Sequence, residues 1–255
     1  QNGTSEELSA TEITQPLLLT ANHALWKSTN FIPEEIDFMA GHSLGEYSAY
    51  IAAESLSFED ALFLVSARAK FMQEAVKDGE GGIAAIIGVP QDKLLKICNA
   101  ISNEGHLVSM ANLNSENQIV ISGTKVGVDK AIESCKENGA KRAIPLAMSV
   151  PSHCKLMTPA SIKFSEVLDK INFKKPKSKV IQNFSVTHTQ DITAIKENLV
   201  SQLYSPVRWS EIMNFFESNN ITEFYECGPS KVLTGLIKRQ FKDVALYSLD
   251  DFGTV

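Results

Sequence analysis

A Gly-x-Ser-x-Gly pattern centred on Ser43 constrains the fold of this chain more than any other feature. A short apolar run at 38–40 precedes the pattern, and a helical pattern at 44–53 follows it. A serine on a tight turn between a strand and a helix adopts a strained backbone conformation that exposes its hydroxyl. We expect glycine at Gly41 and Gly45 because a side chain at either position would collide with the crossing backbone. The pattern therefore predicts a strand–turn–helix unit with an exposed serine.

Ser43 is a candidate nucleophile. A helix that starts directly after it would aim its N-terminal amides, beginning with Leu44 N–H, at an oxyanion formed beside the serine. The pentapeptide alone also allows a simpler interpretation, in which Ser43 only caps the helix. A serine hydroxyl is too weakly acidic to attack a carbonyl carbon at neutral pH, so a catalytic role requires a nearby base.

Of the five histidines, His153 is the best candidate for that base. It follows Pro151, which stiffens the backbone just before it. It also lies where the chain is predicted to return from a small unit inserted at 79–151 to the larger unit around it. We expect His42, adjacent to Ser43, to point away and pack locally. No acidic third member of a hydrolase triad stands out between the serine and the histidine. Cys154 is a less favoured nucleophile, because sequence neighbours point in different directions.

Arg68 lies on a predicted helix with an inward-facing stripe. Ala61, Val65, Arg68 and Met72 are spaced i, i+4, i+7 and i+11, and the other three are apolar. An arginine at such a position needs a partner, because an unpaired buried charge is costly. One interpretation is an internal salt bridge or a side chain that reaches solvent. The other is a bidentate site for a substrate carboxylate.

Strand and helix patterns alternate along the chain and predict an α/β fold. The middle of the chain has the order βαββαβ, which is typical of a ferredoxin-like unit. Its expected elements are strands at 83–87, 107–113, 118–122 and 142–148, with helices at 91–101 and 126–137. Helices are expected on both sides of it at 15–27, 57–77, 158–170, 192–204, 210–219 and 231–238, with strands at 180–183 and 223–226. We therefore predict a small unit over 79–151 inserted into a larger one formed by 1–78 and 152–255.

Composition narrows the class of protein. The chain has 255 residues with 44% hydrophobic residues, which is enough for a large core. No apolar run approaches the roughly 20 residues that span a bilayer, so we predict no membrane contact. The net charge of −6 argues against a nucleic-acid partner. The four cysteines, Cys98, Cys135, Cys154 and Cys227, form neither a zinc pattern nor Cys-x-x-Cys, which favours a reducing, cytoplasmic location and no metal site.

The segment Gly-His-Ser-Leu-Gly-Glu-Tyr at 41–47 resembles the active-site segment of the malonyl-CoA:acyl carrier protein transacylases and of related acyltransferase domains of fatty acid and polyketide synthases. Five further segments fit that family in order along nearly the whole chain: 14–16, 68–72, 150–153, 202–206 and 226–233. The resemblance implies a hydrolase-like large subdomain with a parallel sheet, interrupted by a ferredoxin-like small one, with the active site between them.

The resemblance also implies roles for individual residues. Ser43 and His153 would form a catalytic dyad, with His153 Nδ1–H held by the backbone carbonyl of Gln202. Arg68 would select malonyl by pairing with its free carboxylate. Gln15 matches a pocket glutamine of the family.

Two residues are weaker candidates for substrate binding. Met72 belongs to the same Arg-x-x-Phe-Met context as the arginine, and Asn112 lies on the second strand of the predicted insertion.

The resemblance implies that the substrates are malonyl-CoA and phosphopantetheinylated acyl carrier protein, with no bound cofactor, and we expect a monomer. Acyl carrier proteins are acidic as a class, so a local basic patch should dock them. The candidates are Lys174, Lys175, Lys177 and Lys179, or Lys231 with Lys238 and Arg239. Ordinary solvated charge is the alternative for both groups.

Other functions stay open from the sequence. A serine esterase would need a triad acid and a neutral pocket, and Arg68 argues against it. An acyltransferase domain of a larger synthase would have the same chemistry. The family begins with a strand and a Gly-Gln-Gly-Ser-Gln-like loop whose second glutamine donates to the oxyanion, and neither is found here. We therefore expect an N-terminal strand to be missing, and an inactive fragment that only binds carrier protein is a further alternative.

Overall fold

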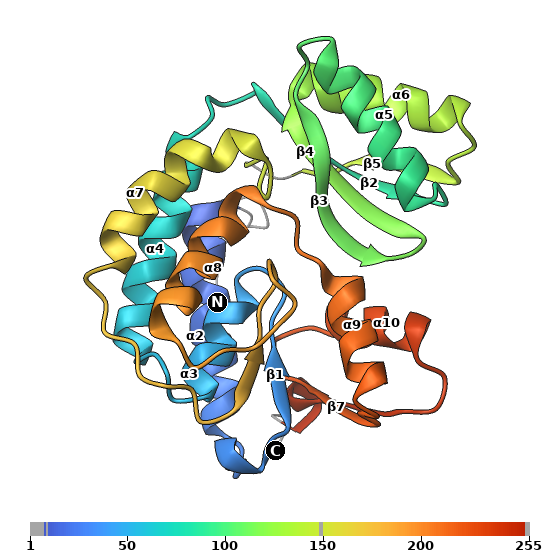
Figure 1. Cartoon of the computed structure of the whole chain (residues 1–255). Helices are drawn as coiled ribbons and strands as arrows, with labels where there is room; N and C mark the ends of the chain where they lie inside the picture. Colours follow the sequence, from blue (N-terminus) through green and yellow to red (C-terminus); the bar gives the residue numbers. More distant parts are fainter. Residues whose placement is uncertain (1–7, 9, 148–149, 253–255) are drawn as a thin grey trace.

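The computed structural model describes residues 8, 10–147 and 150–252. Figure 1 shows an antiparallel sheet set apart from a larger body of helices and short parallel strands. In the larger body, β1 (Phe38–Ala40) pairs in parallel with β6 (Lys179–Ile181). A second parallel pair joins β7 (Glu223–Glu226) to β8 (Ala245–Ser248), a strand that the sequence patterns did not predict. The α/β class with parallel strands is therefore confirmed.

Helices cover these strands and form the main core. They are α2 (Thr11–Lys27), α3 (Gly45–Ala52), α4 (Phe58–Glu74), α7 (Thr158–Leu168) and α8 (Ile192–Tyr204). Ser57 is the N-cap of α4, because its Oγ accepts a hydrogen bond from Asp60 N–H at 3.0 Å. The predicted inward stripe of α4 is buried along its whole length, at 3% exposure or less.

A separate cluster of apolar side chains in the larger body joins β6 to the C-terminal helices α9 (Trp209–Ser218) and α10 (Val232–Gln240). The described part of the larger body also contains short 3₁₀ helices at Pro33–Glu35, Lys155–Met157 and Leu249–Phe252. Ile212, Met213 and Phe216 of α9 pack in this cluster, which explains the strong apolar face of that helix.

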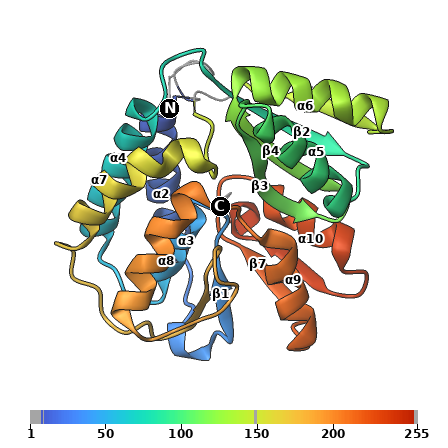
Figure 2. The same ribbon diagram turned by 45° about the horizontal axis from the view of Figure 1, so that its top comes forward.

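The small unit has the predicted βαββαβ order. It consists of β2 (Gly81–Ile87), α5 (Gln91–Asn103), β3 (Val108–Ser115), β4 (Gln118–Thr124), α6 (Lys125–Glu137) and β5 (Arg142–Pro145). The sheet order is β3-β4-β2-β5 with every neighbour antiparallel. The helices α5 and α6 pack against each other on one face (Figure 2) and enclose a separate core. The last strand ends at Pro145, earlier than predicted, because proline has no N–H for the ladder; positions 148–149 lie outside the described residues.

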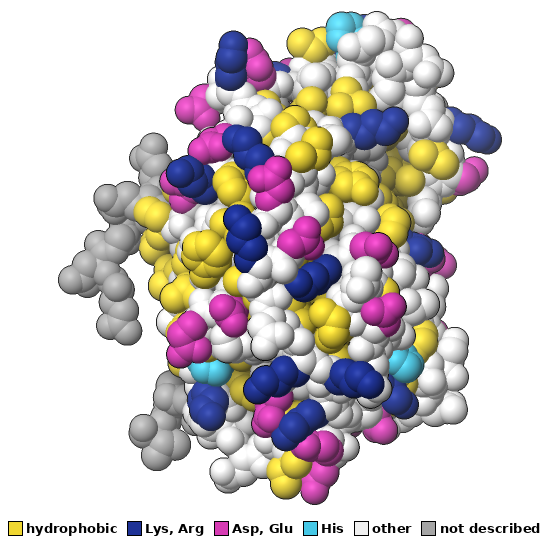
Figure 3. Space-filling model, turned by 60° about the vertical axis from the view of Figure 1, so that its left-hand side comes forward, with side chains coloured by type: hydrophobic (Ala, Val, Ile, Leu, Met, Phe, Trp, Pro, Cys, Tyr) yellow, Lys and Arg dark blue, Asp and Glu magenta, His cyan; other side chains and the backbone are white. Residues whose placement is uncertain are grey.

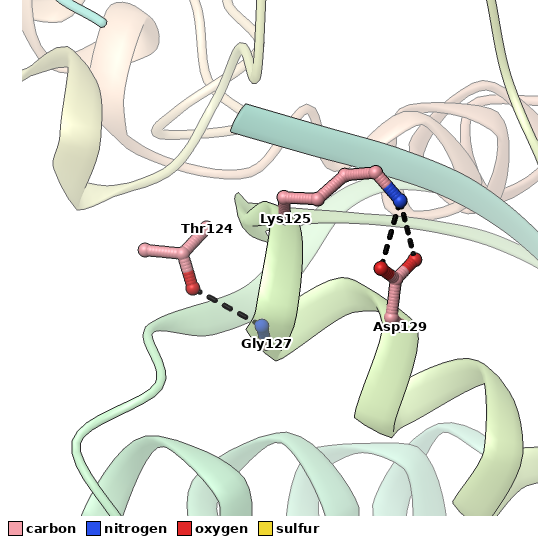
Figure 4. Close-up of polar contacts among 4 residues, drawn as sticks. All are labelled: Thr124, Lys125, Gly127 and Asp129. Atoms are coloured by element: carbon pink, nitrogen blue, oxygen red, sulfur yellow. Dashed lines mark hydrogen bonds and ion pairs between the residues drawn. The ribbon is translucent and has the colours of Figure 1, made fainter. Parts of the chain in front are cut away.

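The start of α6 illustrates how local sequence fixes these helices (Figure 4). Thr124 is the N-cap, and its Oγ1 accepts a hydrogen bond from Gly127 N–H at 3.1 Å. Lys125 is the first residue of the helix, and its Nζ pairs at 2.7 Å with the carboxylate of Asp129, which lies one turn further along. Both contacts join residues of the N-cap and the first five helical positions, and the cap fixes the start of the helix at Lys125, one residue before the predicted start.

The two units meet along strand β3. Leu113 N–H donates to Val207 O at 2.8 Å, and Val207 N–H donates to Ala111 O at 2.9 Å. Ser122 Oγ also donates to Ser152 O at 2.6 Å, next to the segment that returns to the larger body. These contacts place the edge strand of the small sheet beside the region that contains the candidate dyad. The boundaries 1–78, 79–151 and 152–255 stay a prediction.

Figure 3 shows the face of the molecule in which basic and acidic side chains are interspersed among apolar ones. Within the described part of the chain, no helix has the length and apolar character needed to cross a bilayer.

Candidate active site

Ser43 occupies the turn between β1 and α3 with a φ of 53°. This left-handed conformation is rare for serine and marks a strained turn. A Cβ on Gly41 would lie 1.9 Å from the carbonyl carbon of Gly45, so only glycine fits there. The matching prediction for Gly45 is wrong, because a Cβ on that residue would meet no atom within 4 Å. Gly41 faces the crossing backbone of the turn, whereas Gly45 faces open space.

His153 lies beside the serine in a geometry suited to proton transfer. Its Nε2 is 2.8 Å from Ser43 Oγ, and its Nδ1 is 2.8 Å from the backbone oxygen of Gln202. A carbonyl can only accept, so Nδ1 carries the proton and Nε2 accepts from the serine hydroxyl. Burial, and then the charge of Arg68, lower the pKa of His153 to about 3. The imidazole is therefore neutral at neutral pH and able to accept a proton.

Arg68 is almost completely buried, with 2% of its surface exposed. Its Nη1 donates to Gln15 Oε1 at 2.6 Å, and its Nη2 donates to Ser43 Oγ at 3.0 Å and to Gln202 Oε1 at 3.1 Å. The guanidinium also lies 5.7 Å from the centre of the Tyr47 ring. Among the residues that the structure describes, no carboxylate pairs with it. The arginine thus brings a cation, with no carboxylate partner among the described residues, to the candidate nucleophile Ser43.

The remaining pocket candidates differ in how they relate to this centre. Gln15 is buried against Arg68, and its Nε2 lies 3.7 Å from Met72 Sδ. Met72 is therefore buried in contact with the Gln15 side chain. Asn112 is buried on β3 beside Val207, but no hydrogen bond among the described residues joins its side chain to Ser43 or Arg68. Its role in substrate binding stays a prediction.

The Leu44 amide is a candidate oxyanion donor. Leu44 lies between the serine and the first residue of α3, and its carbonyl accepts from Tyr47 N–H at 3.0 Å. Within the described residues its own N–H donates to no backbone oxygen, as an oxyanion donor requires.

Two buried polar residues that sequence reasoning missed support the turn. Asn183 Oδ1 accepts from Ser43 N–H at 2.7 Å, and Asn183 Nδ2 donates to Gly41 O at 2.7 Å. Glu46 Oε2 accepts from Asn183 N–H at 2.9 Å and from Gln202 Nε2 at 2.8 Å. Burial raises the pKa of Glu46 to about 7 against the opposing effect of these donors.

A signal for Glu46 was present in the sequence. Glu46, Ala49, Tyr50 and Ala53 share one helical stripe at i, i+3, i+4 and i+7, and all four are buried. The argument that singled out Arg68 therefore applies to Glu46 as well. Asn183 closely follows β6, at the carboxyl end of a parallel strand, where functional side chains gather in α/β sheets.

The residues considered as alternatives lie outside the dyad. His42 Nε2 is 2.8 Å from Asn114 Oδ1, and its ring packs 5.5 Å from that of Trp209. Cys154 is buried, and its Sγ donates to Pro151 O at 3.2 Å. Burial raises the pKa of this thiol, which makes it a poor nucleophile.

Comparisons with known proteins identify the family to which this chain belongs. The family described as the acyl transferase domain matches residues 1–249. A malonyl CoA-acyl carrier protein transacylase from Salmonella typhimurium is 49% identical over 240 residues, which are 94% of this chain and 77% of that protein. The solved malonyl CoA-acyl carrier protein transacylase from Coxiella burnetii is 42% identical with a TM-score of 0.94, over 98% of this chain and 79% of its own.

A further similar structure is a malonyl-transacylase in complex with its type II PKS acyl-carrier protein. It is 44% identical with a TM-score of 0.91, over 97% of this chain and 80% of its own. Domain match, identity and coverage together identify this protein as a member of the acyl transferase domain family, among the malonyl CoA-acyl carrier protein transacylases.

Proposed function

We propose that this protein transfers a malonyl group from malonyl-CoA to the phosphopantetheine thiol of acyl carrier protein, for fatty acid biosynthesis in the cytoplasm. The observation that carries the proposal is the buried Arg68 guanidinium, 3.0 Å from the oxygen of a serine that is paired with a neutral histidine. A carboxylate-binding group beside an acyl-accepting hydroxyl fits a malonyl thioester. The names of the relatives support the same substrate and the same carrier.

In the first half-reaction, Ser43 Oγ attacks the thioester carbonyl of malonyl-CoA while His153 Nε2 takes the hydroxyl proton. The negative charge on the tetrahedral oxygen is stabilised by Leu44 N–H. The C–S bond then breaks, and the thiol of CoA leaves with the proton from His153. The product is a malonyl ester of Ser43.

In the second half-reaction, the phosphopantetheine thiol of acyl carrier protein gives its proton to His153 and attacks the ester. Ser43 leaves with that proton, and malonyl carrier protein is released. The two half-reactions share one seryl ester, which predicts ping-pong kinetics. The acyl group is carried only by Ser43 and by the thiols of the two substrates, so we propose that the enzyme works without a bound cofactor.

The Gln202 carbonyl supports this chemistry differently from a carboxylate. It fixes the tautomer of His153 without bringing a negative charge close to the ring. Burial and the charge of Arg68 therefore keep the pKa of His153 lowered although the carbonyl opposes them, and the proton that the ring accepts is passed on readily.

A second candidate is an acyltransferase that serves polyketide synthesis. The similarity to a malonyl-transacylase in complex with its type II PKS acyl-carrier protein favours it. Its chemistry would be the same, and only the carrier protein would differ.

The function is tested by incubating the protein with malonyl-CoA and phosphopantetheinylated acyl carrier protein, followed by mass spectrometry of the carrier. We expect one malonyl group on the phosphopantetheinylated carrier and none on the carrier without this group. Release of free malonate without carrier labelling would instead indicate a hydrolase. Carriers from fatty acid and polyketide systems, compared at equal concentration, distinguish the two candidates.

A further inference from the structure

Glu46 is a buried carboxylate that none of the steps above uses. It lies in the first turn of α3 with 1% of its surface exposed. One oxygen, Oε2, accepts two hydrogen bonds, from the backbone N–H of Asn183 at 2.9 Å and from Gln202 Nε2 at 2.8 Å. Burying a carboxylate is costly, and its hydrogen bonds offset only part of the cost. A residue of this kind needs a reason beyond packing.

The two donors on Glu46 belong to residues that hold different parts of the active site. Asn183 accepts the Ser43 N–H and donates to Gly41 O, so it fixes the turn that carries the nucleophile. Gln202 presents its backbone oxygen to His153 Nδ1, so it fixes the base.

The Gln202 side chain adds two further links. Its Nε2 also donates to Ser43 O at 3.1 Å, and its Oε1 accepts from Arg68. The Glu46 carboxylate therefore holds the two residues, Asn183 and Gln202, that contact Ser43, His153 and Arg68.

We propose that Glu46 is a positioning residue for acyl transfer, which sets the distance between Ser43 and His153 through Asn183 and Gln202. This inference rests on the proposed function, since it concerns the rate of Ser43 acylation. Its role requires an acceptor at Oε2 and no proton transfer by Glu46. Loss of the acceptor frees Gln202 from α3, and the imidazole loses its fixed orientation toward the serine.

The expected kinetic effect falls on the rate and spares binding. A misplacement of about 1 Å in reacting groups costs on the order of 100-fold in rate. Arg68 remains anchored by Gln15 at 2.6 Å when Gln202 moves, so the substrate carboxylate keeps its site. We therefore expect Glu46→Ala to lower kcat for Ser43 acylation by about 100-fold while KM for malonyl-CoA changes by less than about 3-fold.

Two conservative variants separate the hydrogen bonds from the charge. Glu46→Gln keeps an oxygen that can accept from both N–H groups, and we expect it to recover most of the rate. Glu46→Asp keeps the charge but is one methylene shorter, so it cannot reach both donors, and we expect a loss of about 10-fold. The aspartate variant still decides the question if the alanine variant does not fold.

Glu226 offers a matched control. It is buried at 7% exposure, and its carboxylate accepts from Leu233 N–H at 2.9 Å and from Thr234 N–H at 2.7 Å. Glu226→Ala removes two hydrogen bonds of the same kind at the start of α10. We expect Glu226→Ala to lower thermal stability, as we also expect for Glu46→Ala. It should leave the acylation rate of the folded protein unchanged.

The experiment measures acyl-enzyme formation with malonyl-CoA by rapid quench and mass spectrometry, per folded molecule, in wild type and in each variant. Absence of an adduct on the wild type would contradict the proposed function itself. If the wild type is acylated, and Glu46→Ala and Glu46→Asp are acylated as fast as the wild type, the positioning role is refuted. It is refuted equally if Glu46→Gln is as slow as Glu46→Ala, or if Glu226→Ala shows the same loss of rate.

Discussion

Replacing Arg68 by alanine should lower the transfer of malonyl far more than the transfer of acetyl. The guanidinium is buried at 2% exposure and has Nη1 on Gln15 and Nη2 on Ser43 Oγ and Gln202 Oε1. A carboxylate that enters this site can exchange these neutral acceptors for two charge-assisted hydrogen bonds. Malonyl has such a carboxylate and acetyl does not.

The magnitude follows from these contacts. Loss of the bidentate contact should cost about 2–4 kcal/mol, or roughly 30- to 1000-fold, with malonyl-CoA. With acetyl-CoA no carboxylate contact is lost. Of the three hydrogen bonds that the variant removes, only the one to Ser43 Oγ involves a reacting atom, and a hydrogen bond to a neutral acceptor is worth about 1 kcal/mol, or roughly 5-fold. The ratio of the two rates should therefore fall by at least about 6-fold. Arg68→Lys keeps the charge without the fork and should lie between the two.

The assay compares acyl-enzyme formation from malonyl-CoA and acetyl-CoA under single-turnover conditions. Arg142→Ala, which removes an exposed arginine on β5, serves as the control and should change neither rate. If both rates fall by the same factor in Arg68→Ala, the arginine supports the fold only, and the carboxylate site is wrong.

Three further predictions concern the base, the turn and the docking of the carrier. The pKa of His153 is lowered to about 3, so below about pH 6.5 the unfolded chain binds a proton that the folded chain does not, and His153 should reduce the stability of the fold as the pH falls. Urea unfolding should show that His153→Asn loses less stability than the wild type between about pH 7 and about pH 5. Equal losses in the two proteins would refute this prediction. Gly41→Ala should cost about 1–3 kcal/mol or more and abolish acylation, whereas Gly45→Ala should be tolerated in melting and acylation assays; equal effects would contradict the geometry of the turn. Reversing the charges of Lys238 and Arg239 should raise KM for carrier protein, most at low salt, and leave malonyl-CoA loading intact, and an unchanged KM would eliminate them as docking residues.

Features that depend on local periodicity could be predicted from the sequence. The stripe on α4 placed Arg68 inside the protein because helical spacing alone decides which face is buried. The bounds of α8 and β7 agree with their patterns residue for residue. The βαββαβ order likewise follows from alternating short patterns, and the rules of strand connection then reduce the possible sheet orders to a few.

Features that depend on contacts between distant residues could not be derived in this way. Ser43 and His153 are 110 positions apart, so the residues alone made His153 only the best of five candidates for the base, and the resemblance to a known family paired it with Ser43. Asn183 lies just after β6 and reaches the serine across 140 positions, and the predicted strand at 180–183 did not indicate which part of the chain its end would contact. The collision predicted for Gly45 was wrong because the pattern treats both glycines alike, while the turn crowds Gly41 only.

The covalent malonyl ester on Ser43 tests the central claim most directly. Intact-protein mass spectrometry after mixing with malonyl-CoA should show one malonyl adduct on the wild type, and peptide mapping should place it on Ser43. The Ser43→Ala variant should show none, and later addition of phosphopantetheinylated acyl carrier protein should remove the adduct from the wild type. An adduct that persists on Ser43→Ala, or one that maps to Cys154, would contradict the assignment of the nucleophile.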